Sequence, residues 1–482
     1  MKTLIKAILT LGVVVASFSC NEDLLNPIPK TTFSDAVVFN TPDRIEQVLN
    51  GLYSNLKGGQ MYGGRLLVYN DIRAEEFLNR TTNGVTGLAT WQHTVLSSTN
   101  EVQNLWSNGY LAINRANIFI QGVNENPDIL EASVAQNYIA QARVIRGLIY
   151  FSLVQMYARP YAENNGASPG LPLRLMPELS DENNDLARSS VAEVYAQILD
   201  DLNFGEQNLA LDNGSPYLNT TRVHRNTAIA LKTRVYLAMG DYANVIAESN
   251  KIVSATAPFT ASTGVMHALQ DDVANVFSEP YTTSESIFSM PFTENNLPGT
   301  QNGLGSYYNP GPRGIGDYYL NMEDGIFAQP VFDADSDDRA GWIFPNEDGL
   351  DYLNKYPRGA QHLDYVPVIR YAEVLLNLSE ALVRSGGDQA RALSLLNAVR
   401  TRSNPAGGYS SFASTESALD AILMERRLEF IGEGLRTTDL MRTLQPIPGK
   451  SNVQSIQPNS PNYIWPISAQ ELLFNNLMTP NN

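Results

Sequence analysis

Apolar residues recur every three or four positions in several long segments, which is the spacing of one helical face. In residues 132–157, Val134, Tyr138, Ala142, Ile145 and Ile149 fall on one side. The same spacing predicts helices over further segments: 191–209, 226–239, 242–253, 365–384, 389–402 and 417–431. Their outward positions are expected to hold the charged residues Asp200, Asp201, Arg400 and Arg402, and Asp364 and Thr415 are placed to cap helix starts. The pattern predicts a mainly α fold.

Two of these predicted hairpins repeat each other. Residues 231–253 and 378–400 align at Gly240-Asp241 and Gly387-Asp388, and their apolar positions match on both sides of that turn. Glycine suits the left-handed backbone that ends a helix, and aspartate caps the helix that follows. This arrangement resembles a tetratricopeptide repeat, although two unrelated hairpins would give similar spacing. Because such hairpins bury a face only by stacking, we expect further hairpins within 101–157 and 191–239.

Two other regions are rich in Gly, Asn, Ser, Thr, Tyr and Pro and hold few periodic runs: 57–99 and 255–364. Within them, 287–292 (IFSMPF) is expected to form a short strand. Long irregular segments on a rigid scaffold commonly carry function. We therefore divide the body of the chain, 35–482, into a tetratricopeptide-like helical scaffold (about 101–254 and 365–442) and a loop-rich ligand-binding lobe (about 57–99 and 255–364).

The first twenty residues predict export. Lys2 and Lys6 precede an apolar stretch of residues 7–19, which is too short to span a bilayer, and Cys20 follows as the single cysteine. We interpret residues 1–20 as a lipoprotein signal peptide with Cys20 as the lipidated residue, and the polar segment 21–34 as a tether. The alternative is an ordinary signal peptide with a coincidental cysteine, since residues 17–19 match a lipobox only loosely.

Composition narrows the function further. The net charge of −17 would repel phosphate backbones, so nucleic-acid binding is not expected. One cysteine excludes an intramolecular disulfide. The 23 tyrosines outnumber the 17 phenylalanines, which suits a protein that presents amphipathic rings to water.

Several motifs together resemble the SusD/RagB family of Bacteroidetes outer-membrane lipoproteins. They include 142–157 (ARVIRGLIYFSLVQMY), 170–173 (GLPL), 365–382, 463–467 (YIWPI) and, most specifically, 425–442 (ERRLEFIGEGLRTTDLMR). The resemblance covers about residues 35–480. It implies a repeat scaffold that supports an irregular ligand lobe on the outside of the outer membrane. It also implies capture of glycans, or of peptides in some branches, for a SusC-like TonB-dependent transporter, without cleavage.

The carboxylates favour structure over catalysis. Glu425, Glu429 and Glu433 share one helical face among several arginines, which predicts ion pairs rather than the opposed acid and base of a glycosidase. We assign no catalytic residue.

No metal or cofactor is assigned either. Residues 333–344 lack the Gly and Glu that an EF-hand needs at its sixth and twelfth positions, which are Asp338 and Phe344. A capped turn with Arg339 pairing is the preferred interpretation, and a looser calcium site is left open. The four histidines lack zinc-ligand spacing.

Sugars offer flat C–H faces and hydroxyl groups, so loop aromatics with polar neighbours are the predicted ligand contacts. The choices are Trp91, Tyr307, Tyr308, Asp71, Arg80, Tyr62 and Trp342, in the two stretches where the family places its sugar-binding rings. Packing inside the loops is the alternative for each ring. Trp106 and Trp465 are expected to lie in the core.

The leading hypothesis is a non-enzymatic, surface-facing lipoprotein that binds oligosaccharides and acts as the lid of a transporter. The alternatives are a peptide-binding import lipoprotein of the same family, an exported glycoside hydrolase, and a helical-repeat adaptor that binds only proteins.

Overall fold

A computed structural model describes residues 38–180, 182 and 184–481 of the chain. The predicted signal peptide, Cys20 and the tether lie outside these residues. The α-helices are α3 (Pro42–Leu56), α4 (Arg65–Ile72), α5 (Leu88–Trp91), α6 (Asn100–Glu125), α7 (Ala132–Tyr157), α8 (Tyr161–Asn164), α9 (Val191–Asn208), α10 (Pro216–Thr221), α11 (Arg225–Met239), α12 (Tyr242–Ser249), α13 (Leu304–Tyr308), α14 (Tyr371–Arg384), α15 (Gln389–Ser403), α16 (Thr415–Glu429), α17 (Arg436–Arg442) and α18 (Ala469–Phe474). Short 3₁₀ helices are η2 (Val273–Phe277), η3 (Ile326–Ala328), η4 (Asp338–Trp342) and η5 (Pro461–Tyr463).

The strands are few and short. They are β1 (Phe77–Asn79), β2 (Ser286–Met290), β3 (Tyr318–Leu320), β4 (Ile343–Pro345), β5 (Asp351–Leu353) and β6 (Val366–Arg370). Each pairs antiparallel with one partner, giving the ribbons β1–β3, β2–β6 and β4–β5. The mainly α fold is therefore confirmed.

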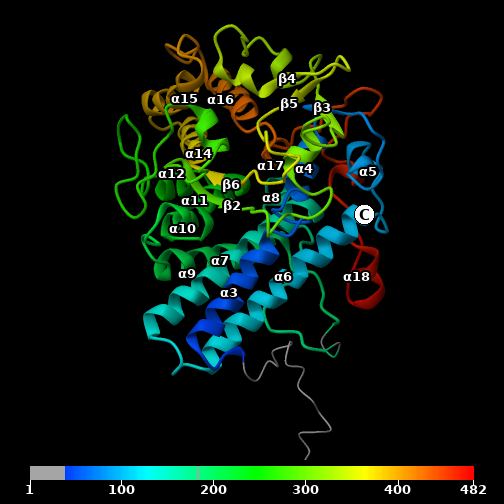
Figure 1. Cartoon of the computed structure of the whole chain (residues 1–482), viewed down its shortest axis with the longest axis vertical. Coiled ribbons are helices and arrows are strands. Elements are labelled where there is room, and N and C mark those ends of the chain that lie inside the picture. Colours follow the sequence, from blue (N-terminus) through cyan, green and yellow to red (C-terminus); the bar gives the residue numbers. More distant parts are fainter. Residues whose placement is uncertain (1–37, 181, 183, 482) are drawn as a thin grey trace, which may run out of the picture.

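Successive long helices pack side by side along the chain. Helix α7 lies against α6 and α9, α9 lies against α11, and α12 and α15 both lie against α14. Figure 1 shows α3, α6, α7 and α9 in the lower half, with α11, α12, α14 and α15 rising above them. The further hairpins expected within 101–157 and 191–239 are thus α6–α7 and α9–α11.

The two matching hairpins turn as predicted, with one shift. Gly240 ends α11 at φ +75°, and the Asp241 side chain accepts a 3.2 Å hydrogen bond from the Asn244 amide. In the second hairpin the left-handed residue is Gly386, at φ +68°, one position before the glycine that the alignment matched. The Asp388 side chain caps α15 through a 2.9 Å bond from the Arg391 amide.

The predicted helix over 365–384 is wrong in its first turn. Residues Val366–Arg370 form β6 and pair with β2, and α14 begins only at Tyr371. Both strands are buried throughout, and a continuous apolar run reads the same way in a buried strand and a buried helix. Asp364 consequently caps no helix. Helix α16 is capped by Ser414 rather than by Thr415.

Three charged residues predicted on outer faces are instead buried in ion pairs. Asp201 is fully buried and accepts bonds from Arg143 and Arg146 at 2.8 and 2.7 Å. Arg400 and Arg402 bond Glu425 and Glu429. Asp200 does lie outside. Helical spacing alone could not reveal that oppositely charged partners cover these faces.

One continuous hydrophobic core joins the lobe and the scaffold. Phe77 and Tyr308 of the lobe belong to the same buried cluster as Leu148 and Leu375 of the scaffold. Trp106 and Trp465 lie in this cluster, as predicted. In the described part of the chain, no helix combines the length and apolarity that crossing a bilayer requires.

Candidate functional site

The structure contradicts the prediction that the chosen loop rings form an exposed platform. Trp91, Tyr307, Tyr308, Tyr62 and Trp342 all have exposed fractions of 6% or less. Their polar atoms bond inside the protein. The Trp91 indole donates to the Phe77 carbonyl at 2.9 Å, and the Tyr307 hydroxyl donates to the Gln301 carbonyl at 2.7 Å. These rings fill the core beneath irregular backbone and satisfy its carbonyl groups, which explains why loops without regular structure are rich in tyrosine.

Tyr62 and Trp342 also make their contacts inside the protein. The Tyr62 hydroxyl lies 2.9 Å from the Ser152 hydroxyl of α7, which ties the lobe to the scaffold. The Trp342 ring packs edge-on against Phe277, and the Lys355 ammonium lies 4.1 Å from its centre.

Asp71, a predicted polar contact for sugar, is also buried. Its carboxylate accepts from the Gly434 amide at 3.0 and 3.1 Å and from the Tyr308 hydroxyl at 3.1 Å. Burial raises the pKa of Asp71 well above its ordinary value, against the lowering effect of these donors. Because Gly434 lies in the 425–442 segment, Asp71 holds the lobe against the scaffold and does not face a ligand.

Arg80 alone among the seven predicted ligand-binding residues stays exposed. It follows β1, where its backbone amide donates to the Asp317 carbonyl at 2.9 Å. Its guanidinium donates to the carbonyls of Gly316 at 2.8 Å and Ile315 at 2.5 Å. Arg80 forms no ion pair with any carboxylate of the described residues, so its charge is held in place and remains available.

A surface next to Arg80 exposes aromatic and polar side chains, whereas the five predicted rings are buried. We call it the rim and define it as Arg80, Arg313, Tyr319, Phe344 and Asp348. It lies over the ribbons β1–β3 and β4–β5 at the upper right of Figure 1. Strand alternation creates it, because Tyr318 points inward and is fully buried whereas Tyr319 is partly exposed.

Neighbouring side chains fix the rim residues. The Tyr319 ring centre lies 6.4 Å from that of Tyr352, whose hydroxyl donates to Asp348 at 2.8 Å. The Arg313 guanidinium lies 4.6 Å from the Phe344 ring centre and donates to the Asn354 side chain at 3.0 Å. Two partly exposed rings, two cationic donors and one carboxylate acceptor are the groups that stack on a sugar ring and bond its hydroxyls.

Of the candidate residues on the rim, the sequence-based choices included Arg80 alone and left out Tyr319, Arg313, Phe344 and Asp348. The adjacent pair Tyr318-Tyr319 was a usable signal, because two rings in one short strand must face opposite ways. No comparable signal existed for the others, whose placement depends on how distant loops meet.

The 425–442 carboxylates are ion-paired, as predicted. Glu429 accepts from Arg402 at 2.5 Å and from Arg370 at 2.9 Å, and Glu425 accepts from Arg339 at 2.5 Å. Burial alone would raise the pKa of Glu429, but the charges of Arg402, Arg370 and Arg339 lower it to about 2. A glycosidase general acid requires the opposite, a raised pKa beside an open cleft.

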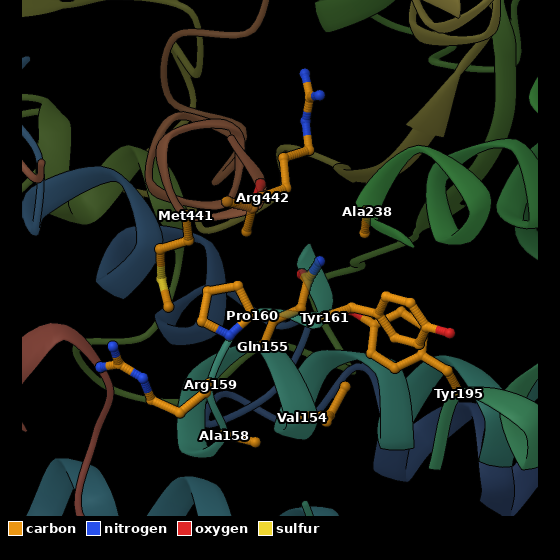
Figure 2. Close-up of a pocket in the computed structure, with 11 residues that line it drawn as sticks. Val154, Gln155, Ala158, Arg159, Pro160, Tyr161, Tyr195, Ala238, Met441 and Arg442 are labelled. Atoms are coloured by element: carbon orange, nitrogen blue, oxygen red, sulfur yellow. The ribbon is translucent and has the colours of Figure 1, made fainter. Parts of the chain in front are cut away.

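The pocket between α7, α8 and α17 is too small for a sugar. Its volume is about 20 Å³, close to the space that one or two water molecules need. Figure 2 shows Pro160 between Met441 and Tyr161, and the Arg442 side chain extending away from the other lining residues. Arg442 is engaged elsewhere, with Glu380 at 2.7 Å and Asp439 at 2.8 Å.

The acidic stretch at 333–338 forms the predicted capped turn. Asp333 accepts from the Asp335 amide at 3.1 Å, and Asp337 pairs with Arg339 at 2.8 Å. No group of three or more His, Cys, Asp or Glu side chains with metal-binding geometry occurs among residues that the structure describes.

Known proteins share this sequence and this fold. A family model described as "SusD family" matches residues 344–482, and one described as "Starch-binding associating with outer membrane" matches residues 23–237. A crystal structure of a SusD superfamily protein from Bacteroides fragilis is 32% identical, with a TM-score of 0.83, and the match covers 92% of this chain and 100% of that one.

More distant relatives agree. SusD-like protein P2 of Formosa agariphila is 23% identical over 92% of this chain and 93% of its own length. A solved structure described as a laminarin binding SusD-like protein is 24% identical, with a TM-score of 0.72, over 92% of this chain and 99% of that one. The chain thus belongs to the SusD family.

Proposed function

We propose that this chain is a non-enzymatic, surface-facing lipoprotein of the outer membrane. It captures oligosaccharides at the rim and delivers them to a SusC-like TonB-dependent transporter. The rim carries this proposal, because it places the partly exposed rings of Tyr319 and Phe344 beside Arg80 and Arg313, neither of which forms an ion pair with a carboxylate of the described residues. The starch-binding family model and the laminarin-binding relative point to the same class of ligand.

The ion pairing of the carboxylates in the 425–442 segment supports capture without cleavage. Glu429 and Glu433 are buried and bound to Arg370, whose charge lowers the pKa of both against the effect of burial, so both are held as anions. Asp348, on the rim, already accepts the Tyr352 hydroxyl. Its side-chain hydrogen bonds lower its pKa and so favour the ionised form, although burial acts in the opposite direction.

An exposed apolar surface supports a protein partner. Leu473 and Phe474 of α18 are 70% and 65% exposed, and Leu96 is 66% exposed. The two segments that carry these residues meet, because the Ala469 amide at the start of α18 donates to the Ser97 carbonyl at 2.9 Å. Contiguous exposed apolar residues commonly mark a protein contact, and docking against the transporter would cover them.

Isothermal titration calorimetry against neutral oligosaccharides derived from starch and laminarin tests the proposal. We expect binding to at least one of them, weakened about tenfold by Arg80→Ala or Tyr319→Ala. The matched control is Tyr242→Ala, which removes a partly exposed scaffold ring and should leave affinity unchanged. Binding to peptides with none to any saccharide would move the chain to peptide import. Sustained release of reducing sugar would show that it is a hydrolase.

A further inference from the structure

A second surface of the molecule concentrates positive charge in a cavity. The cavity lies between the end of α3, helix α10 and the loop after β2, and its volume is about 200 Å³. We call it the Lys57 pocket, after one of its lining residues. Figure 1 shows α3 and α10 well away from β3, β4 and β5, so this pocket is separate from the rim. The volume exceeds the space for one water more than tenfold, yet it is below that of pockets for drug-sized ligands, and so it suits a single sugar unit.

Two cationic side chains, Lys57 and Arg222, line the pocket, and each lies over the face of an aromatic ring. The Arg222 guanidinium lies 4.1 Å from the Tyr53 ring centre and bonds the Asn50 side chain. The Lys57 ammonium lies 4.9 Å from the Phe292 ring centre and donates to the Pro291 carbonyl at 2.7 Å. A ring face stabilises a cation without neutralising it. The positive charge of both groups is therefore still available to a ligand.

No acidic residue offsets these charges. The pocket lining contains no Asp or Glu, and neither Lys57 nor Arg222 forms an ion pair with any carboxylate in 38–180, 182 or 184–481. One guanidinium nitrogen of Arg222, Nη1, is buried with no hydrogen-bond partner. Burial, and then the charge of Arg222, lower the pKa of Lys57 to about 8. In a chain with a net charge of −17, an uncompensated pair of cations in a cavity indicates a place for an anion.

The edge of the pocket offers groups for a sugar. The Tyr217 side chain, from α10, is 50% exposed and lines the pocket. The side-chain amides of Asn50 and Asn296 are exposed at the lining and can bond hydroxyl groups. An inorganic anion would use the two cations alone, whereas an acidic sugar would use the ring and the amides as well.

We propose that the Lys57 pocket binds an acidic sugar unit, with a carboxylate or sulfate ester between Lys57 and Arg222 and the sugar ring against Tyr217. The rim would bind neutral oligosaccharides, and the Lys57 pocket would add a preference for acidic ones. It rests on the proposed function only in taking the ligand to be a saccharide.

Calorimetry on the same full chain tests this with four probes: a glucuronate-containing oligosaccharide, a sulfated oligosaccharide, a neutral oligosaccharide and sodium sulfate. We expect at least one acidic saccharide to bind about tenfold more tightly than the neutral one. The two acidic probes distinguish a carboxylate site from a sulfate site. Raising NaCl from 50 to 500 mM should weaken acidic binding and leave neutral binding unchanged.

Variants locate the effect. Lys57→Gln and Arg222→Gln should each remove most of the preference for acidic saccharides, and the exposed Tyr217→Ala should weaken saccharide binding without changing the melting temperature. Arg225→Gln is the matched control, since it removes an equal charge outside the pocket and should keep the preference.

Three outcomes would overturn the proposal. They are equal affinity for acidic and neutral saccharides, an equal loss of preference in Arg225→Gln, and sodium sulfate that binds as tightly as the sulfated saccharide. If neutral saccharides bind and acidic ones bind no more tightly, only the proposal for the Lys57 pocket is refuted. The absence of binding to every saccharide would refute the proposed function as well.

Discussion

Glu429 of the scaffold and Asp364 of the lobe are both buried carboxylates, but their surroundings shift their pKa values in opposite directions. In the scaffold, Glu429 lies among arginines that lower its pKa to about 2. In the lobe, Asp364 accepts from the Arg358 amide at 3.0 and 3.2 Å and from the Tyr281 hydroxyl at 3.4 Å, and burial raises its pKa to about 7. Arginines from β6, α15 and η4 converge on Glu429, whereas Asp364 receives one backbone amide and one hydroxyl. The two regions should therefore respond differently to mutation and to pH.

The largest expected effect is on the scaffold network. Arg370→Ala would leave Glu285, Glu429 and Glu433 without the guanidinium that now lies within 2.9 Å of each. Removing one partner of a buried ion pair costs about 3–5 kcal/mol. Urea unfolding followed by circular dichroism would measure the free energy of unfolding. The exposed Arg313→Ala is the control and should change it by about 0.5 kcal/mol or less. A similar small loss in Arg370→Ala would show that the network contributes little.

A smaller effect is expected for the lobe's hydroxyl anchors. Tyr308→Phe removes the donor to buried Asp71 and should lower the free energy of unfolding by about 1–3 kcal/mol, without changing saccharide affinity. The control is Tyr217→Phe, which removes an exposed hydroxyl. Impaired sugar binding in Tyr308→Phe, with normal stability, would restore Tyr308 as a ligand contact.

The pH response should separate the two regions. Folded Asp364 keeps its proton up to about pH 7, whereas the unfolded chain releases it near 3.8, so its contribution to stability falls as pH rises between these values. Asp364→Asn should therefore gain about 2–3 kcal/mol over wild type between pH 5 and pH 8. Glu429 acts in the reverse sense, because its stabilising charge is lost only as pH falls from about 4.5 towards 2. A difference between wild type and Asp364→Asn that does not vary with pH would contradict this account.

The smallest effect on stability is expected at the rim. Tyr319→Ala removes a partly exposed ring and should change the melting temperature little, equivalent to about 0.5 kcal/mol, while saccharide binding falls. A fall in stability as large as that of Tyr308→Phe would place Tyr319 with the buried anchors instead.

The same contrast explains what the sequence could reveal. Helix α7 spans the predicted residues 132–157. The apolar residues that repeat along this sequence form the helix face that packs against its neighbours, so the pattern predicts the helix directly. The ion pairing of Glu425 and Glu429 was predictable for a similar reason, since their spacing puts both on one face.

The lobe gave no such guide. Tyr307 and Tyr319 each belong to a Tyr-Tyr pair in the irregular segment 255–364, yet Tyr307 is buried and Tyr319 is partly exposed at the rim. The difference depends on which distant backbone covers each ring, and local pattern does not record that. The excess of tyrosine over phenylalanine likewise reflects buried hydroxyls that anchor loops more than rings offered to water.

The unbroken core has a mechanical consequence. Because loops and helices share one buried cluster, bending the lobe against the scaffold would pull packed apolar side chains apart, so we expect a force applied through α18 to move the rim together with the rest of the body. A bound saccharide would then move with the whole molecule. Its release would depend on how the entire body rotates relative to the membrane.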